Sequence, residues 1–116
     1  MAAQPDLVKI KHALLARCTS LRQRHERIQW DLQRRNEPLV VDAPDRAIQL
    51  QNDETLQVID DATNDELMTI EETLQRLAQG LYGICRDCGG NIEDVRLRVL
   101  HAVTCAECAR EFATQA

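Results

Sequence analysis

The sequence predicts a mainly α-helical protein, in which a long antiparallel helical hairpin (a coiled coil) precedes a small four-cysteine zinc module with a C-terminal helix. Three observations predict this class. Two long segments with helical periodicity flank a short link that contains proline. Only three of the 116 residues are aromatic, which leaves little material for a large globular core. Four of the five cysteines form two CxxC pairs. We expect residues 1–80 to form the hairpin, with an acidic tip at 39–47, and residues 81–116 to form the zinc module.

The first segment is predicted to be a helix over residues 6–36. Polar residues interrupt a strict seven-residue seam in this segment, and a 3.6-residue periodicity through Cys18 and His25 repairs part of it. Pro5 lies near the expected start, and Asn36-Glu37-Pro38 is expected to end the helix. The apolar residues of the expected buried face are Leu7, Ile10, Leu14, Leu21, Ile28 and Leu32.

The second segment is predicted to be a helix over residues 43–79, with Gly80 as its stop. Its apolar residues step by three or four, which is the spacing of a coiled-coil seam. A short link joins the two helices, so we expect them to run antiparallel. The residues of the expected seam are Leu56, Ile59, Thr63, Leu67, Ile70, Leu74, Leu77 and Leu81.

Charge is distributed unevenly along the chain. Residues 1–36 carry a net charge of +5, residues 37–79 carry −9, and residues 80–116 carry −1. A basic helix beside an acidic helix favours their pairing, and the overall excess of acid speaks against direct sequence-specific DNA binding. No apolar run approaches the roughly 18 residues of a membrane span, and the sequence opens without a signal-peptide core. We therefore expect a cytoplasmic protein with no membrane partner, and a monomer, because the hairpin buries its own seam.

Cys85, Cys88, Cys105 and Cys108 form the pattern C-x2-C-x16-C-x2-C. Two CxxC knuckles deliver four thiolates to a tetrahedral Zn²⁺, and paired CxxC motifs in a reducing compartment indicate metal more often than disulfides. A redox CxxC or an iron–sulfur site is the alternative, but redox motifs typically occur in a βαβ setting that is absent here. Four thiolates leave no open position for substrate, so we expect a structural zinc site, no catalytic residues and no enzymatic activity.

Other residues near these motifs have simpler interpretations. The stretch Val95–Val103 is rich in β-branched and apolar residues and is expected to be extended or a short hairpin, followed by a final helix over residues 105–114. Cys18 is expected to be a small buried apolar residue. Trp30 is expected to pack across the hairpin. His101 lies close to the second knuckle and could in principle replace a cysteine as a ligand.

The link between the helices contains Val-Val-Asp-Ala-Pro-Asp-Arg-Ala, residues 40–47. Asp42 is a favourable N-cap, Pro44 suits a first helical turn, and Asp45 completes a pattern similar to a capping box. Two carboxylates beside the apolar stretch 39–41 are also typical of a tip that enters a partner, although capping is the simpler interpretation. One acid can cap the helix while the other contacts the partner, so both interpretations stay open.

The combination of tip and zinc motifs resembles the DksA/TraR family of RNA polymerase-binding regulators. The tip shows D-x-x-D-x-A at Asp42, Asp45 and Ala47, and the segment Leu81–Gly89 is similar to the opening of the family's zinc site. A second CxxC follows, the tip and zinc motifs are separated by a distance in the chain that fits the family, and the resemblance covers about residues 6–115.

The resemblance implies that the hairpin enters the secondary channel of bacterial RNA polymerase and that Asp42, Asp45 and Ala47 lie near its active site. The expected result is a changed lifetime of promoter complexes, without chemistry by the factor itself. Long members that respond to guanosine tetraphosphate use basic side chains at positions that correspond here to Ala62, Glu66, Thr69 and Ala109. That departure speaks against dependence on this alarmone.

Other functions are compatible with parts of the pattern. A zinc-ribbon module that binds nucleic acid or protein without contacting polymerase is the main alternative, although the zinc segment is nearly neutral and has few aromatic residues. A coiled-coil scaffold, a hydrolase and a transcript-cleavage factor of the Gre type are further alternatives. Gre-type factors also insert an acidic hairpin tip but lack this four-cysteine module.

Overall fold

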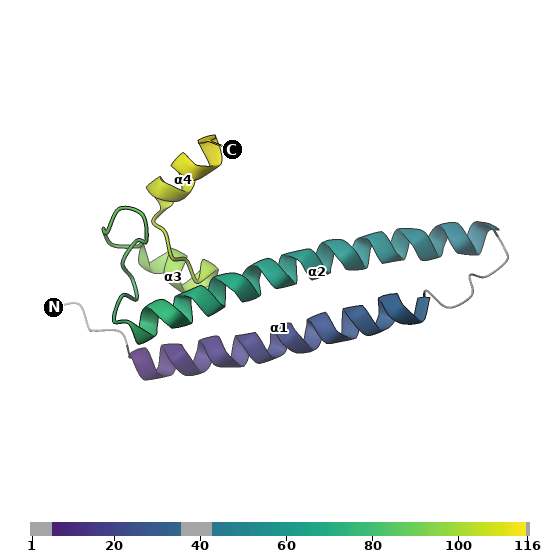
Figure 1. The fold of residues 1–116 in the computed structure, drawn as a ribbon, viewed down its shortest axis with the longest axis horizontal. Coiled ribbons are helices and arrows are strands. Elements are labelled where there is room, and N and C mark those ends of the chain that lie inside the picture. The colour runs from purple at the N-terminus through teal and green to yellow at the C-terminus, as the bar shows by residue number, and fades with distance from the viewer. Residues whose placement is uncertain (1–5, 36–42, 116) are drawn as a thin grey trace. The chain divides into compact units, whose positions relative to one another are not determined.

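The computed structural model describes residues 6–35 and 43–115 and contains four helices in these ranges (Figure 1). They are α1 (Leu7–Arg35), α2 (Ala43–Ala78), α3 (Asp94–Leu100) and α4 (Ala106–Gln115). The predictions of helices over 6–36, 43–79 and 105–114 are confirmed to within one residue at each end. The chain forms two compact units, one with Arg17–Leu67 and one that combines α1 up to Ala16 with the chain from Met68 onward.

In the unit Arg17–Leu67, α1 and α2 run antiparallel. Arg17 pairs with Glu66, whereas His25, further along α1, meets Asp60, which comes earlier in α2. The buried face of α1 includes Cys18, which is 2% exposed, so its interpretation as a small core residue is confirmed. The predicted periodicity through Cys18 and His25 is likewise confirmed, because both residues lie on the face of α1 that meets α2.

The seam of α2 differs from the prediction at Ile59, and also at Leu74, where the neighbouring Thr73 is the buried residue. Ile59, expected in the seam, is 43% exposed, and the neighbouring Asp60 is buried instead with 1% exposure. Steps of three then four and of four then three both fit a coiled coil, so spacing alone cannot choose between positions 59 and 60. Hydrogen bonds from α1 to the Asp60 carboxylate favour Asp60 over Ile59 at the buried position. Trp30 also differs from expectation, because 60% of it stays exposed.

The other unit combines the two helix ends with the zinc module. Leu14 of α1 and Ile70 of α2 are buried in it. Polar contacts join α2 to the module. Thr73 lies within hydrogen-bond distance of the His101 carbonyl, Arg76 donates to the Ile84 carbonyl at 2.9 Å, and Glu72 pairs with Arg86. The module is therefore fixed to the helix end by side chains that reach its backbone.

The end of α2 follows the prediction from Gly80. This glycine has φ +76°, a conformation that few other residues adopt readily. The Leu81 N–H then donates to the Arg76 carbonyl at 2.8 Å, as in a Schellman motif. The chain thereby turns away from the helix axis directly before the first cysteine pair.

The segment Val95–Val103 is not extended, and this prediction is wrong. Residues 94–100 form α3, and its backbone ends at His101 in the left-handed region with φ 53°. Leu97 packs against the small core of the module, while Val95 and Val99 are exposed. An Asp94–Arg98 pair at 2.9 Å supports the turn from outside. One apolar contact at helical spacing thus overrides a weak β preference.

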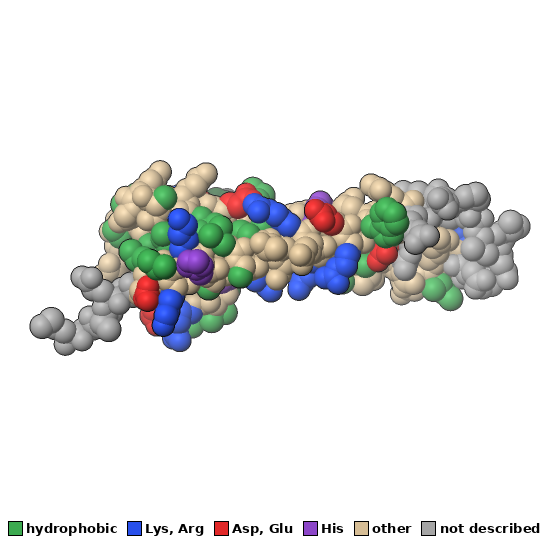
Figure 2. All heavy atoms as spheres, turned by 90° about the horizontal axis from the view of Figure 1, so that it is seen from below, with side chains coloured by type: hydrophobic (Ala, Val, Ile, Leu, Met, Phe, Trp, Pro, Cys, Tyr) green, Lys and Arg blue, Asp and Glu red, His purple; other side chains and the backbone are tan. Residues whose placement is uncertain are grey.

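Apolar side chains gather on one face of this second unit (Figure 2). The same unit contains a cavity of about 190 Å³, with Leu14 of α1, Tyr82 and Leu97 of α3 in its lining. Burial raises the pKa of the Tyr82 hydroxyl, as does the nearby Asp94 carboxylate. Within the described ranges, none of the helices combines the length and the apolar character that spanning a membrane requires.

We predict that Leu21→Ala destabilises the hairpin strongly. Leu21 has no exposed surface, so the truncation removes apolar contacts and leaves a cavity, which typically costs about 2–5 kcal/mol. Urea unfolding followed by circular dichroism measures the change. Val58→Ala is the matched control, because Val58 is 68% exposed and its truncation should change stability by about 0.5 kcal/mol or less. Equal effects would contradict the observed core.

A second prediction concerns Thr73, which is 3% exposed and faces the His101 carbonyl. Thr73→Val keeps the side-chain shape but leaves this carbonyl without its hydroxyl partner, so we expect a loss of about 1–3 kcal/mol. The control is Thr55→Val, because the exposed Thr55 hydroxyl bonds only to the Gln51 carbonyl of its own helix. Denaturant midpoints of the zinc-loaded variants distinguish the two. Unchanged stability of Thr73→Val would show that the contact is not needed.

Candidate metal centre

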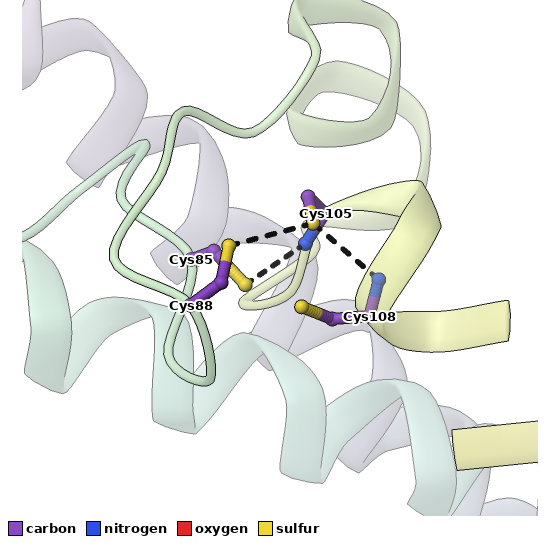
Figure 3. A group of neighbouring side chains, drawn as sticks. All are labelled: Cys85, Cys88, Cys105 and Cys108. Carbon is purple, nitrogen blue, oxygen red and sulfur yellow. Dashed lines mark hydrogen bonds between the residues drawn. The ribbon is translucent and has the colours of Figure 1, made fainter. Parts of the chain in front are cut away.

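Two segments far apart in the module bring the four cysteines together. Cys85 and Cys88 lie in the loop after α2, Cys105 lies directly before α4, and Cys108 lies in its first turns (Figure 3). All four sulfur atoms lie within 4.8 Å of one another, and none of the cysteines forms a disulfide. The metal site predicted from the spacing therefore corresponds to one compact cluster.

Backbone N–H groups point at the sulfur atoms. The Cys105 N–H donates to Cys85 Sγ at 3.3 Å, the Cys108 N–H to Cys105 Sγ at 3.4 Å, and the Gly90 N–H to Cys88 Sγ at 3.4 Å. Gly89, with φ +74°, allows the tight turn between the first knuckle and Gly90. Such donors stabilise negative charge on sulfur, which is the form that binds metal.

The electrostatics of the cluster call for a cation. Backbone N–H donors at Cys88 and Cys105 lower the pKa of Cys85 to about 6, so this thiol ionises readily. Side-chain hydrogen bonds with Cys105 and Cys85 raise the pKa of Cys108 well above its usual range. Four sulfur atoms this close cannot all carry charge without a counter-ion, and a divalent metal removes that repulsion.

The geometry fits zinc. A Zn–S bond of about 2.3 Å in a tetrahedral site places neighbouring sulfur atoms about 3.8 Å apart. Cys88 Sγ and Cys105 Sγ are 3.8 Å apart. Four soft sulfur donors in a tetrahedron select Zn²⁺ over harder ions such as Mg²⁺ or Ca²⁺. With all four positions taken by protein, the ion supplies structural cross-linking rather than a place for substrate.

Sequence reasoning missed the side chains that position the two knuckles. Arg96 of α3 donates to the Thr104 carbonyl at 3.2 and 3.3 Å, directly before Cys105. The Glu93 carboxylate accepts the Ala106 N–H at 3.2 Å at the start of α4. Hydrogen bonds from the Glu93 and Ala106 backbone N–H groups lower the pKa of this carboxyl. These contacts form because α3 brings Glu93 and Arg96 close to residues 104–106, and no spacing in the sequence predicts them.

The remaining site predictions lie elsewhere in the chain. Asp42 lies outside the described residues. Asp45 belongs to the first turn of α2, but its side chain is not among those described, and Ala47 is exposed on the same helix. His101 contributes its backbone carbonyl to Thr73, and the sulfur cluster is complete without it. The proposed capping and contact roles of the two tip acids stay predictions.

A helical hairpin followed by a four-cysteine structural zinc site defines a class of small zinc-finger hairpin proteins. Comparison with known families makes this specific. The family model for the DnaK suppressor protein-like N-terminal domain matches residues 10–77, and the model for the prokaryotic dksA/traR C4-type zinc finger matches residues 80–112. The chain therefore belongs to the DksA/TraR family, as its motifs predicted, and zinc as its structural cofactor is confirmed.

Two relatives give the extent of the similarity. The chain is similar to the structure of transcription factor DksA2 from Pseudomonas aeruginosa, with a TM-score of 0.74, 26% identity, and coverage of 97% of this chain and 92% of that chain. It is also 36% identical over 61 residues to an uncharacterized protein from Aquifex aeolicus (strain VF5). That alignment spans 49% of this chain and 42% of the relative, less than half of its length.

We predict that Cys88→Ser abolishes stable zinc binding. The substitution replaces a soft thiolate by a hydroxyl. We expect zinc affinity to fall by more than about 100-fold, which is the upper range for losing a residue that only hydrogen-bonds to a metal ligand. Zinc content after gel filtration and release to a chromophoric chelator measure it. The control is Cys18→Ala, which should retain one zinc per chain because Cys18 is not in the cluster. Loss of zinc in both variants would contradict the ligand assignment.

Proposed function

We propose that this protein is a transcription factor that binds bacterial RNA polymerase. In this proposal the hairpin enters the secondary channel, the tip residues Asp42, Asp45 and Ala47 approach the active site, and Cys85, Cys88, Cys105 and Cys108 hold a structural Zn²⁺. The factor changes the stability of promoter complexes and catalyses no reaction itself. Polymerase is its partner, and the proposal places the protein in the cytoplasm as a monomer.

The observation that carries the proposal is the similarity in both length and fold to a transcription factor of the same family. The alignment with DksA2 covers nearly all of both chains, so hairpin and zinc finger are both included. Two family models cover the hairpin and the zinc finger separately. A likeness confined to the zinc finger would be compatible with many functions, because such modules recur in unrelated proteins.

The tip supplies a physical route to regulation. Asp45 falls in the first turn of α2, and Ala47 is exposed two residues later. A carboxylate that reaches a site containing a catalytic metal ion and basic side chains alters the local charge balance without reacting. A factor with that property binds some states of polymerase better than others and shifts their populations.

The proposal does not include dependence on guanosine tetraphosphate. Binding such a polyanion needs basic side chains, and Glu66 is acidic at one of the corresponding positions. Glu66 is moreover engaged by Arg17, whose guanidinium donates two hydrogen bonds to it at 3.0 and 3.1 Å. That side-chain hydrogen bond raises the pKa of Arg17, so the guanidinium remains charged beside Glu66. Ala62 and Ala109 offer no charge at all.

Binding is tested with zinc-loaded protein and RNA polymerase core, in competition with a Gre-type factor. We expect saturable binding at micromolar concentration or below and displacement by the Gre-type factor, because both would occupy the same channel. Absence of binding would overturn the proposal and favour a zinc-finger interaction module with another partner. Binding without competition would place the contact outside the channel.

We predict that Asp45→Asn retains polymerase binding but weakens the effect on promoter-complex lifetime by about tenfold, equivalent to roughly 1.4 kcal/mol. The reason is loss of a charge that acts only in the bound state. Asp61→Asn is the matched control, because it removes the same charge from an exposed position of α2 about 24 Å further along the helix. An unchanged lifetime effect in Asp45→Asn, with unfolding midpoint lowered, would instead identify Asp45 as a helix cap.

A further inference from the structure

A buried carboxylate occupies the seam of the hairpin. Asp60 of α2 is 1% exposed, although Ile59 beside it would fill the seam at an equally acceptable spacing and is 43% exposed. Opposite Asp60, His25 occupies the matching seam position of α1. Burying a charge in place of an available isoleucine costs free energy, so this arrangement is not explained by stability alone.

Both oxygen atoms of the Asp60 carboxylate have hydrogen-bond partners. Its Oδ1 lies 2.7 Å from His25 Nδ1, and its Oδ2 accepts from Gln29 Nε2 at 3.0 Å and from Asn64 Nδ2 at 3.5 Å. Two of the three partners belong to α1 and lie one helical turn apart. The Asp60 carboxylate therefore has its partners only when α1 and α2 stand at one particular height relative to each other.

Other registers lack these partners. A slip of one heptad moves the helices by about 10 Å along their axes and replaces His25 opposite Asp60 by Cys18 or Leu32. Neither Cys18 nor Leu32 supplies the contact that His25 makes with Oδ1, so the carboxylate keeps Asn64 of its own helix but loses the His25–Gln29 pair. In the direction that brings Cys18 opposite Asp60, His25 would meet Asp53, so Asp60 is the group that makes this slipped pairing unfavourable. The other seam residues, mostly apolar, discriminate weakly between heptads.

We propose that Asp60, held by His25 and Gln29, fixes the register in which α1 and α2 pair within Arg17–Leu67. Asp60 thereby specifies one register of helix pairing, and in return the seam buries less apolar surface. The inference does not depend on polymerase binding, because it concerns only the pairing of the two helices in the free protein.

The test measures register directly. Spin labels on Gln23→Cys and Gln51→Cys, both exposed positions, are placed in a zinc-loaded Cys18→Ala background, and electron–electron distances are recorded. We expect a single distance population for the reference protein and for Asp61→Leu, which alters the neighbouring exposed acid. Asp60→Leu should add a second, shorter population, because the allowed slip brings position 51 closer to the level of position 23.

Thermal unfolding separates specificity from stability. We expect Asp60→Leu to unfold at the same or a higher temperature than the reference, since an apolar side chain suits the seam. His25→Leu should unfold at a lower temperature, because it leaves the Asp60 carboxylate without a partner at Oδ1. Asp60→Asn, which retains hydrogen-bonding capacity, should restore the single distance population.

Two outcomes would overturn the proposal. A single, unchanged distance population in Asp60→Leu would show that other contacts fix the register. A lowered unfolding temperature with an unchanged distance would show that Asp60 contributes stability instead. If Asp60→Leu fails to fold, the double variant His25→Leu/Asp60→Leu has a wholly apolar contact at this level. A single native distance in that variant overturns the proposal in the same way, and a second population supports it.

Discussion

The four-thiolate cluster is the interaction on which the C-terminal third of the molecule depends. The buried core around it consists of Cys85, Ile92, Ala102 and Cys105, with Leu97 and Cys108 against it. Three of these six residues are metal-binding cysteines, so the apolar core of the module is built around the metal site. A segment this short does not bury enough apolar surface to offset its conformational entropy. A zinc ion that links two distant knuckles supplies the missing free energy, and it also fixes where α4 begins.

Around that centre, side chains from regular helices hold irregular backbone in place. Thr73 and Arg76 of α2 reach carbonyl groups before the second knuckle and before Cys85, and Arg96 of α3 reaches the Thr104 carbonyl. Each contact gives a carbonyl of the loop a hydrogen-bond partner. The loop thereby gains a defined conformation in which its N–H groups face sulfur. The conformation of the loops at the metal site thus depends on side chains that α2 and α3 provide.

The sequence alone predicts the parts of this structure that rest on periodicity and on ligand spacing. Helical repeats give α1 and α2, glycine gives the end of α2, and the two CxxC pairs give the cluster. The failures arise where one interaction decides between two acceptable patterns. Spacing permits either Ile59 or Asp60 in the seam, and the opposing His25 and Gln29 select Asp60. The valines of 95–103 favour an extended chain, and only the packing of Leu97 selects a helix. The His25–Asp60 contact joins residues 35 apart in the sequence, which no local pattern predicts.

These two failures differ in what they reveal. The α3 segment follows the ordinary rule that burial of one apolar side chain overrides local propensity. Asp60 breaks the rule that apolar side chains take the buried position, and an isoleucine stands next to it as the unused alternative. A hairpin built for stability alone would bury Ile59. A polar contact that forms in only one register fixes the alignment of α1 with α2, which matters where the hairpin must place its end at a defined position. Burial of Asp60 in place of Ile59 is therefore better explained by specificity of helix pairing than by the stability of the hairpin.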